Sequence, residues 1–182
     1  MRMLNSMVNL VWPVNTWLIH VLIRVESRDL KQESDGGCEA KLPEWLTDNE
    51  ITAVLDILRS QFPDIQWFQS TLRGQNLSFK CLSGSFIQII HVDGNHWITV
   101  EGVRASFVKV YDSMYQSTTA NTKMQIAQMI NTLSENHIDI HIQHTQFQQG
   151  RMECGLYATA FAVEMCFGNN PAAYRLVFMA AS

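Results

Sequence analysis

The sequence lacks several features that would each assign the protein to a definite class. Its four cysteines form no Cys-x-x-Cys pair, so neither a zinc-binding motif nor a dithiol redox couple is expected. Basic residues are not in excess, because 13 lysines and arginines stand against 17 aspartates and glutamates and give a net charge of −4. A nucleic-acid partner is therefore not expected.

The chain also has no long, unbroken apolar run. Its longest apolar stretch, Met7 to Ile23, is interrupted by Asn9, Pro13, Asn15 and His20. A membrane-spanning helix needs about 20 predominantly apolar residues, and polar interruptions are costly in lipid. No small-residue cleavage site follows, as a secretory signal requires. We favour an element packed on the domain, or an extension, over a membrane anchor.

The isolated cysteines bear on the redox compartment. Cys166 follows Cys154 by twelve residues in one predicted helix, which is too far along the axis for a disulfide. Reduced thiols are typical of intracellular proteins. We expect a monomer in the nucleus or the cytoplasm.

The length and hydrophobic content indicate one domain. The chain has 182 residues, of which 47% are hydrophobic, and this suffices for a substantial core. Residues 24–40 are polar and contain Gly36-Gly37, a composition typical of linkers. We predict an N-terminal extension and linker over residues 1–44 and one domain over residues 45–182.

Periodicity within the domain predicts an α+β fold, with helices flanking a mostly antiparallel sheet. Thr47 and Glu50 have the spacing of a capping box at the start of the first helix. Residues 64–84 are irregular, with turns at Gly74 and Gly84. The predicted helices span 47–61, 119–133 and 154–167, the predicted strands span 86–92, 97–100, 107–111 and 138–142, and residues 93–95 form a turn.

The last predicted helix is apolar on nearly every side, so we expect it to be buried in the centre of the domain. Cys154 and Gly155 stand at its start. The first backbone N–H groups of a helix have no internal partner and carry partial positive charge. This position stabilises a thiolate, the nucleophilic form of cysteine.

Two further residues are predicted to meet in a hairpin. His96 and Asp112 lie equally far from Arg104, the centre of the turn-like stretch between the second and third predicted strands. Residues placed in this way face each other across an antiparallel pair. A carboxylate there fixes the imidazole tautomer and stabilises imidazolium, which leaves the other ring nitrogen to accept a thiol proton. A register error of one residue would break this contact.

A glutamine completes the candidate constellation. The side-chain amide of Gln148, six residues before Cys154, is suited to donate a hydrogen bond to an oxyanion beside the sulfur; Gln149 is its rival. The order His, Asp, Gln, Cys places the nucleophile last, which excludes papain topology but not the same chemistry on another fold.

Four short motifs together resemble the ubiquitin-like-protein proteases, the family that contains the SUMO-specific proteases. They cover roughly Trp45 to Phe167, in the family's order and spacing: Trp45-Leu46-Thr47-Asp48, His96-Trp97, Val110-Tyr111-Asp112-Ser113 and Gln148 to Gly155. The resemblance implies the adenain-like and Ulp-like cysteine proteinase fold. Glu153 departs from the aspartate usual before the cysteine, and past about Gly168 the match ends.

The resemblance also implies roles. His96 would be the general base, Asp112 the residue that orients it, Cys154 the nucleophile and Gln148 the oxyanion donor. Trp45, Trp97 and Gly155 would bind the substrate, and the two tryptophans match a pair that clamps the Gly-Gly tail of a ubiquitin-like modifier. A tail without side chains can pass between two flat rings where a bulkier one clashes. No cofactor is required.

Three alternatives stay open at this stage. His91 and His96 lack a third ligand with suitable spacing, which disfavours a metal site. The fold and clamp are compatible with a catalytically impaired module that binds a modifier without cutting it. The same chemistry also suits a protease of a viral or transposon polyprotein.

Overall fold

The structure, a computed structural model, describes residues 45–65, 68–82, 84–104, 106–130, 137–173 and 176. The predicted extension over 1–44, including the stretch from Met7 to Ile23, lies outside the described residues, so its boundary with the domain stays a prediction. Within the described ranges no helix is both long and apolar enough to cross a membrane.

A four-stranded mixed sheet forms the centre of the fold. Its strands are β1 (Phe86–Val92), β2 (His96–Arg104), β3 (Phe107–Tyr111) and β4 (Asp139–Gln143), in that spatial order. The first two pairings are antiparallel, and β3 pairs with β4 in parallel. The parallel pair is joined through helix α4 (Ala120–Met129), as parallel strands need a crossover. The predicted α+β fold with a mostly antiparallel sheet is confirmed.

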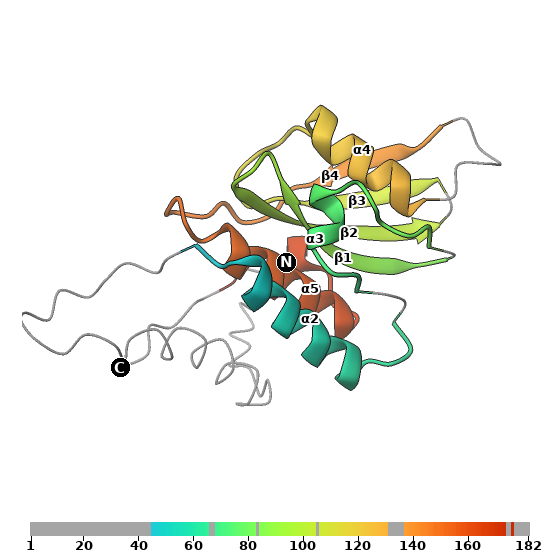
Figure 1. Cartoon of the computed structure of the whole chain (residues 1–182). Helices are drawn as coiled ribbons and strands as arrows, with labels where there is room; N and C mark the ends of the chain where they lie inside the picture. The colour runs from blue at the N-terminus through green and yellow to red at the C-terminus, as the bar shows by residue number, and fades with distance from the viewer. Residues whose placement is uncertain are drawn as a thin grey trace, which may run out of the picture. The chain divides into compact units, whose positions relative to one another are not determined.

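Helices cover both faces of this sheet (Figure 1). Helix α4 packs on one face, where Ile126 and Met129 join an apolar core cluster with residues of the sheet. Helix α5 (Cys154–Cys166) packs on β1 and β2 from the other side, and helix α2 (Asp48–Gln61) packs on α5. Because both faces are covered, β1 and β2 are buried along most of their length.

The first helix begins where the sequence predicts. The backbone N–H of Thr47 donates to Glu50 Oε2 over 2.6 Å, which is the return bond of the predicted capping box. The buried face of α2 consists of Ile51, Val54, Leu55 and Leu58. The helix ends at Gln61, two residues before Pro63.

Three local predictions need correction. The segment expected to be irregular contains a short helix, α3 (Leu72–Gln75), so Gly74 is helical and not a turn. Helix α4 ends at Met129 rather than at Leu133, because Ile130 is extended and forms a parallel bridge with Leu82. Strand β2 extends to Arg104, so the expected turn begins later than predicted.

The predicted β1–β2 turn is present and has left-handed backbone. Asp93 and Gly94 have φ angles of 54° and 82°, values that suit Asp-Gly in a tight hairpin. The hairpin brings Val92 opposite His96 and His91 opposite Trp97. It therefore places two histidines at neighbouring positions on adjacent strands.

Candidate active site

The predicted pair of His96 and Asp112 is formed, although the strands are in a different register. Thr99 faces Tyr111 and Val100 faces Val110, so Asp112 is displaced by two residues from the position directly opposite His96. A shift of two keeps a side chain on the same face of the sheet, whereas a shift of one would reverse it. His96 Nε2 lies 2.8 Å from Asp112 Oδ1, and both residues are buried.

The carboxylate of Asp112 is held by main-chain donors. The N–H groups of Met114 and Tyr115 donate to Asp112 Oδ1 over 2.7 and 3.0 Å, the same oxygen that contacts His96. The Thr145 hydroxyl donates to the Asp112 backbone carbonyl over 2.7 Å. The turn after β3 thus fixes the carboxylate independently of the histidine.

Cys154 is the first residue of α5 and is 1% exposed. His96 Nδ1 is buried and has no hydrogen-bond partner at ordinary geometry in the described part of the chain. Cys154 contributes to raising the pKa of the same imidazole, so the thiol lies near it. One ring nitrogen therefore contacts the carboxylate, and the other is left for the sulfur.

These contacts control the protonation of His96. Burial disfavours the imidazolium, but hydrogen bonds and charge attraction from Asp112 and Cys154 outweigh it. Together they raise the pKa of His96 from 6.5 to about 9. The geometry consequently favours a protonated imidazole at neutral pH, which is the form that pairs with a thiolate.

Gln148 is oriented by Ser113, the residue after Asp112. The Ser113 hydroxyl donates to Gln148 Oε1 over 2.7 Å, and the Gln148 backbone N–H donates to the Ser113 carbonyl over 2.8 Å. Gln148 Nε2 donates one hydrogen to the Gly150 carbonyl over 2.7 Å, which leaves its second hydrogen for another acceptor. Gln149, the rival, is exposed. Ser113 lies in the Val110-Tyr111-Asp112-Ser113 motif, but nothing in the sequence pattern signals its contact with Gln148.

Glu153 stabilises the loop that precedes Cys154. Its Oε2 accepts hydrogen bonds from the backbone N–H groups of Gln149 and Gly150, over 3.1 and 3.0 Å. The side chain thus folds the Gln148-to-Cys154 loop back on itself. In the sequence this residue stood out only as a departure from aspartate.

The two tryptophans proposed as a clamp differ in exposure. Trp45 is 36% exposed, whereas Trp97 is 2% exposed. The Trp97 indole N–H donates to the Leu46 carbonyl over 2.9 Å, and its ring stacks on His91 with the centroids 4.3 Å apart. The clamp stays a prediction, because little of the Trp97 ring is accessible in this conformation.

Gly155 allows a close approach between α5 and the chain before α2. A Cβ at this position would lie 2.9 Å from Leu46 Cβ, a distance that real side chains do not tolerate. The same Leu46 bonds to Trp97. The absence of a side chain at Gly155 therefore allows the segment that carries Trp45 to pack against the N-terminus of the cysteine helix.

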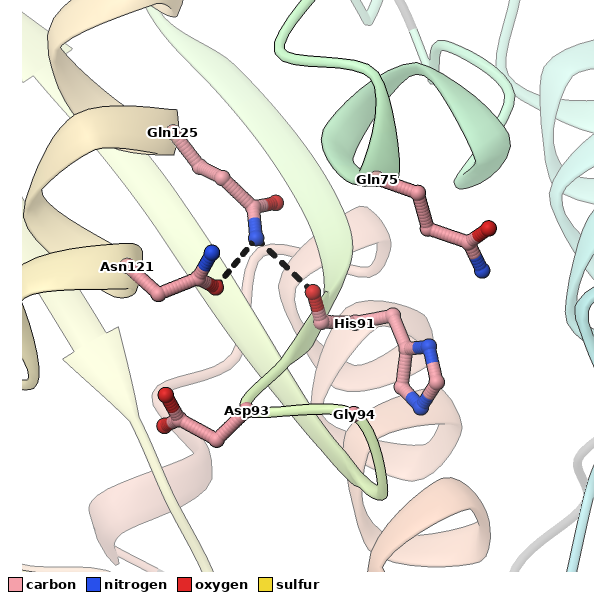
Figure 2. Close-up of a pocket in the computed structure, with 6 residues that line it drawn as sticks. All are labelled: Gln75, His91, Asp93, Gly94, Asn121 and Gln125. Carbon is pink, nitrogen blue, oxygen red and sulfur yellow. Dashed lines mark hydrogen bonds between the residues drawn. The ribbon is translucent and has the colours of Figure 1, made fainter.

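A pocket lies beside the β1–β2 turn and is lined from α3, β1 and α4. It has a volume of about 440 Å³, and its lining residues are Gln75, His91, Asp93, Gly94, Asn121 and Gln125. Figure 2 shows the Gln125 amide bonded to the His91 carbonyl and to Asn121. No group of three or more potential metal ligands occurs among the residues that the structure describes.

Comparisons with known proteins match the fold but not the sequence. No family model matches the chain, and no curated protein matches it. Among solved structures, the Ulp1 protease domain in complex with Smt3, the yeast ortholog of SUMO, is 14% identical with a TM-score of 0.53, over 70% of this chain and 68% of that one.

Two further structures agree. The SUMO protease Ulp1 with its catalytic cysteine oxidised to a sulfenic acid is 14% identical with a TM-score of 0.55, over 85% of this chain and 84% of that one. The Xanthomonas campestris effector protein XopD bound to ubiquitin is 14% identical with a TM-score of 0.50, over 76% and 86%. The chain therefore has the Ulp-like cysteine protease fold that the sequence predicted.

Proposed function

We propose that the protein is a cysteine peptidase or isopeptidase that cuts after the C-terminal Gly-Gly of a ubiquitin-like modifier. The observation that carries this proposal is the buried His96–Asp112 pair beside Cys154, at the N-terminus of a buried helix. Similarity to SUMO protease domains and to an effector bound to ubiquitin supports this class of substrate. We place the activity in the nucleus or the cytoplasm.

In the first chemical step the thiolate of Cys154 attacks the carbonyl carbon of the terminal glycine. The carbonyl electron pair moves onto oxygen and forms a tetrahedral oxyanion. His96, protonated at Nδ1, donates its proton to the leaving amine as the carbon–nitrogen bond breaks. The products are a thioester on Cys154 and a free lysine amine or peptide.

In the second step His96 Nδ1 takes a proton from water, and the resulting hydroxide attacks the thioester carbonyl. The carbon–sulfur bond breaks, which restores the thiolate and releases the modifier as a carboxylic acid that then loses its proton to solvent. Asp112 keeps Nε2 protonated throughout and stabilises the imidazolium. The chemistry is complete without a cofactor.

Two kinds of donor support the oxyanion. The first kind is the backbone N–H groups at the start of α5, which have no partner within the helix. The second is the remaining hydrogen of Gln148 Nε2, because Ser113 bonds to the oxygen of the same amide. An oxyanion hole of this kind acts on charge that is present only in the transition state.

Access of the Gly-Gly tail depends on the segment around Trp45. Its ring is partly exposed and is linked to the cysteine helix through the contact between Leu46 and Gly155. A tail of two glycines presents backbone only, so it fits where Trp97 leaves little space. The folded part of the modifier then supplies most of the binding surface.

The test is covalent capture. Modifiers with an electrophile in place of the C-terminal carboxylate, derived from SUMO and from ubiquitin, are incubated with the full chain, and adducts are located by mass spectrometry. We expect an adduct at Cys154 and none in Cys154→Ser. Replacing the two glycines of the probe by alanines is the matched substrate control and should abolish labelling.

The alternatives give different results in the same assay. A binding module retains modifier binding in a pull-down but forms no Cys154 adduct. If the protein is a polyprotein protease, a peptide electrophile labels Cys154 and a modifier probe does not. Either result would replace the proposed function.

A further inference from the structure

Tyr115 lies directly against the imidazole of His96. The two rings are perpendicular, with an interplanar angle of 82° and centroids 5.2 Å apart. The Tyr115 side chain is 53% exposed, whereas His96 is 3% exposed. A half-exposed ring in contact with a buried one lies between it and solvent on that side.

The backbone of the same residue holds the partner of His96. The Tyr115 N–H donates to Asp112 Oδ1, the oxygen that His96 contacts. One residue thus touches both members of the pair, the carboxylate through its main chain and the imidazole through its ring. The backbone contact fixes where the ring can lie.

We propose that Tyr115 is a positioning residue for His96, whose ring keeps water away from the His96–Asp112 pair and holds the imidazole between Asp112 and Cys154. This inference rests on the proposed function only for its catalytic consequence. The ring contact and the shielding concern the folded protein alone. The phenol hydroxyl is not needed for either role.

The effect of excluding water from His96 depends on the charged and titratable groups around it. They are Asp112 after β3, Cys154 on α5 and His91 on β1, besides Tyr115 itself. Charge interactions weaken in a medium of high dielectric constant. Water entering beside the imidazole would therefore shift its titration from the value set by Asp112 and Cys154 back toward that of a solvated histidine.

The experiment compares Tyr115→Ala with Tyr115→Phe in the full chain. The His96 ring C–H signals are titrated by NMR, and alkylation of Cys154 by iodoacetamide is followed across pH by mass spectrometry. In Tyr115→Ala we expect the His96 midpoint to fall by at least about half a pH unit. The alkylation rate near pH 8 should fall about threefold. Tyr115→Phe should match the native protein in both.

A matched control is available at the far end of α5. Phe167 is 50% exposed and makes a similar perpendicular contact with Phe62, with centroids 5.0 Å apart. Phe167→Ala removes an equivalent aromatic contact away from the site, so it should leave the His96 midpoint unchanged.

Three outcomes would overturn the inference. They are an unchanged His96 midpoint in Tyr115→Ala, an equal shift in Tyr115→Phe, and an equal shift in Phe167→Ala. Neither readout uses a modifier, so both test Tyr115 independently of the proposed function. The proposed function fails separately if no modifier probe labels the native protein. Cleavage of a modifier fusion, where it occurs, should fall about tenfold in Tyr115→Ala.

Discussion

The β1–β2 hairpin carries two histidines whose polar surroundings resemble each other in composition but not in chemistry. His96 contacts Asp112 and lies near Cys154. His91 lines the pocket with Asp93, Gln75 and Gln125 (Figure 2). Each region contains a histidine, a carboxylate and glutamine side chains, and the two histidines are five residues apart.

The protonation of the two histidines differs. Burial lowers the pKa of His91, and the charge of His96 lowers it further, although Asp48 opposes this. His96 is more buried, yet its pKa is raised, because a carboxylate contacts it at 2.8 Å and a thiol lies beside it. Burial alone therefore produces a neutral histidine, and only a directly bonded charge produces the imidazolium that a thiolate requires.

The largest expected effect comes from removing that charge. All three N–H donors around Asp112 meet its Oδ1, so Asp112→Asn can keep these hydrogen bonds while losing the negative charge. Cleavage of a modifier fusion at pH 7 should fall on the order of a thousandfold. Asp93→Asn, the equivalent change in the pocket, should leave the rate unchanged. An equal loss of cleavage rate in Asp112→Asn and Asp93→Asn would show that the two carboxylates do not differ in function.

The charge on His96 should also make the stability of the folded protein depend on pH. The pKa of His96 is raised to about 9 in the folded state against 6.5. The stabilisation it provides is therefore complete below pH 6.5 and is lost as the pH rises through about 9. In Asp112→Asn the free energy of unfolding, measured with urea, should fall less between these two pH values.

Glutamine substitutions give the next largest effect. Gln148→Ala removes the proposed oxyanion donor and should reduce kcat about a hundredfold with little change in KM. Gln75→Ala removes a pocket glutamine that bonds to Asp48 and should leave kcat unchanged. Gln149→Ala tests the rival donor; a larger loss there than in Gln148→Ala would reassign the role.

Alanine substitutions at two glycines test how closely the side chains pack in each region. Gly155→Ala would place a Cβ 2.9 Å from Leu46 Cβ, so the Trp45 segment must shift. We expect a loss of about 1–3 kcal/mol in the free energy of unfolding. Gly74→Ala meets the Gln125 amide end and a Phe79 ring atom. We expect a smaller loss, because the close contact is with the end of a side chain rather than with a Cβ, and because alanine favours the helix. Urea unfolding of both variants measures the difference.

The smallest effect concerns His91. Its folded-state pKa lies below 6.5, so the unfolded chain binds its proton first and stability is lost as the pH falls through this range. His91→Phe can keep the stacking on Trp97 and removes the titration. The loss of stability between pH 7 and pH 5 should become smaller than in the native protein. A steeper loss would show that His91 is stabilised by protonation, which contradicts the contrast with His96.

Local patterns were sufficient for most elements. The capping box fixed the start of α2, and β1 has the bounds that its isoleucine-rich run predicted. The candidate catalytic pair was also found from sequence, although its register was wrong by two residues. The error was harmless because side chains alternate with a period of two, so the predicted and observed positions share a face.

The errors arose where distant contacts overrule local preference. Ile130 continues an apolar helical pattern, yet it bridges Leu82 in an extended conformation. Helix α3 has only four residues, and both its N-cap residue Thr71 and its last residue Gln75 bond to Asp48, which is distant in the sequence. None of these contacts leaves a signal in the periodicity of its own segment.

The sequence by itself determined which residues carry reactive groups and where most helices and strands lie, because both depend on side-chain chemistry and on spacings of a few residues. Only the tertiary structure decided that Ser113 orients Gln148, that Trp97 is covered and that Tyr115 shields His96. These three contacts join residues that lie 35, 51 and 19 positions apart in the chain, respectively. Their geometry depends on how the layers pack, and packing is a property of the whole chain.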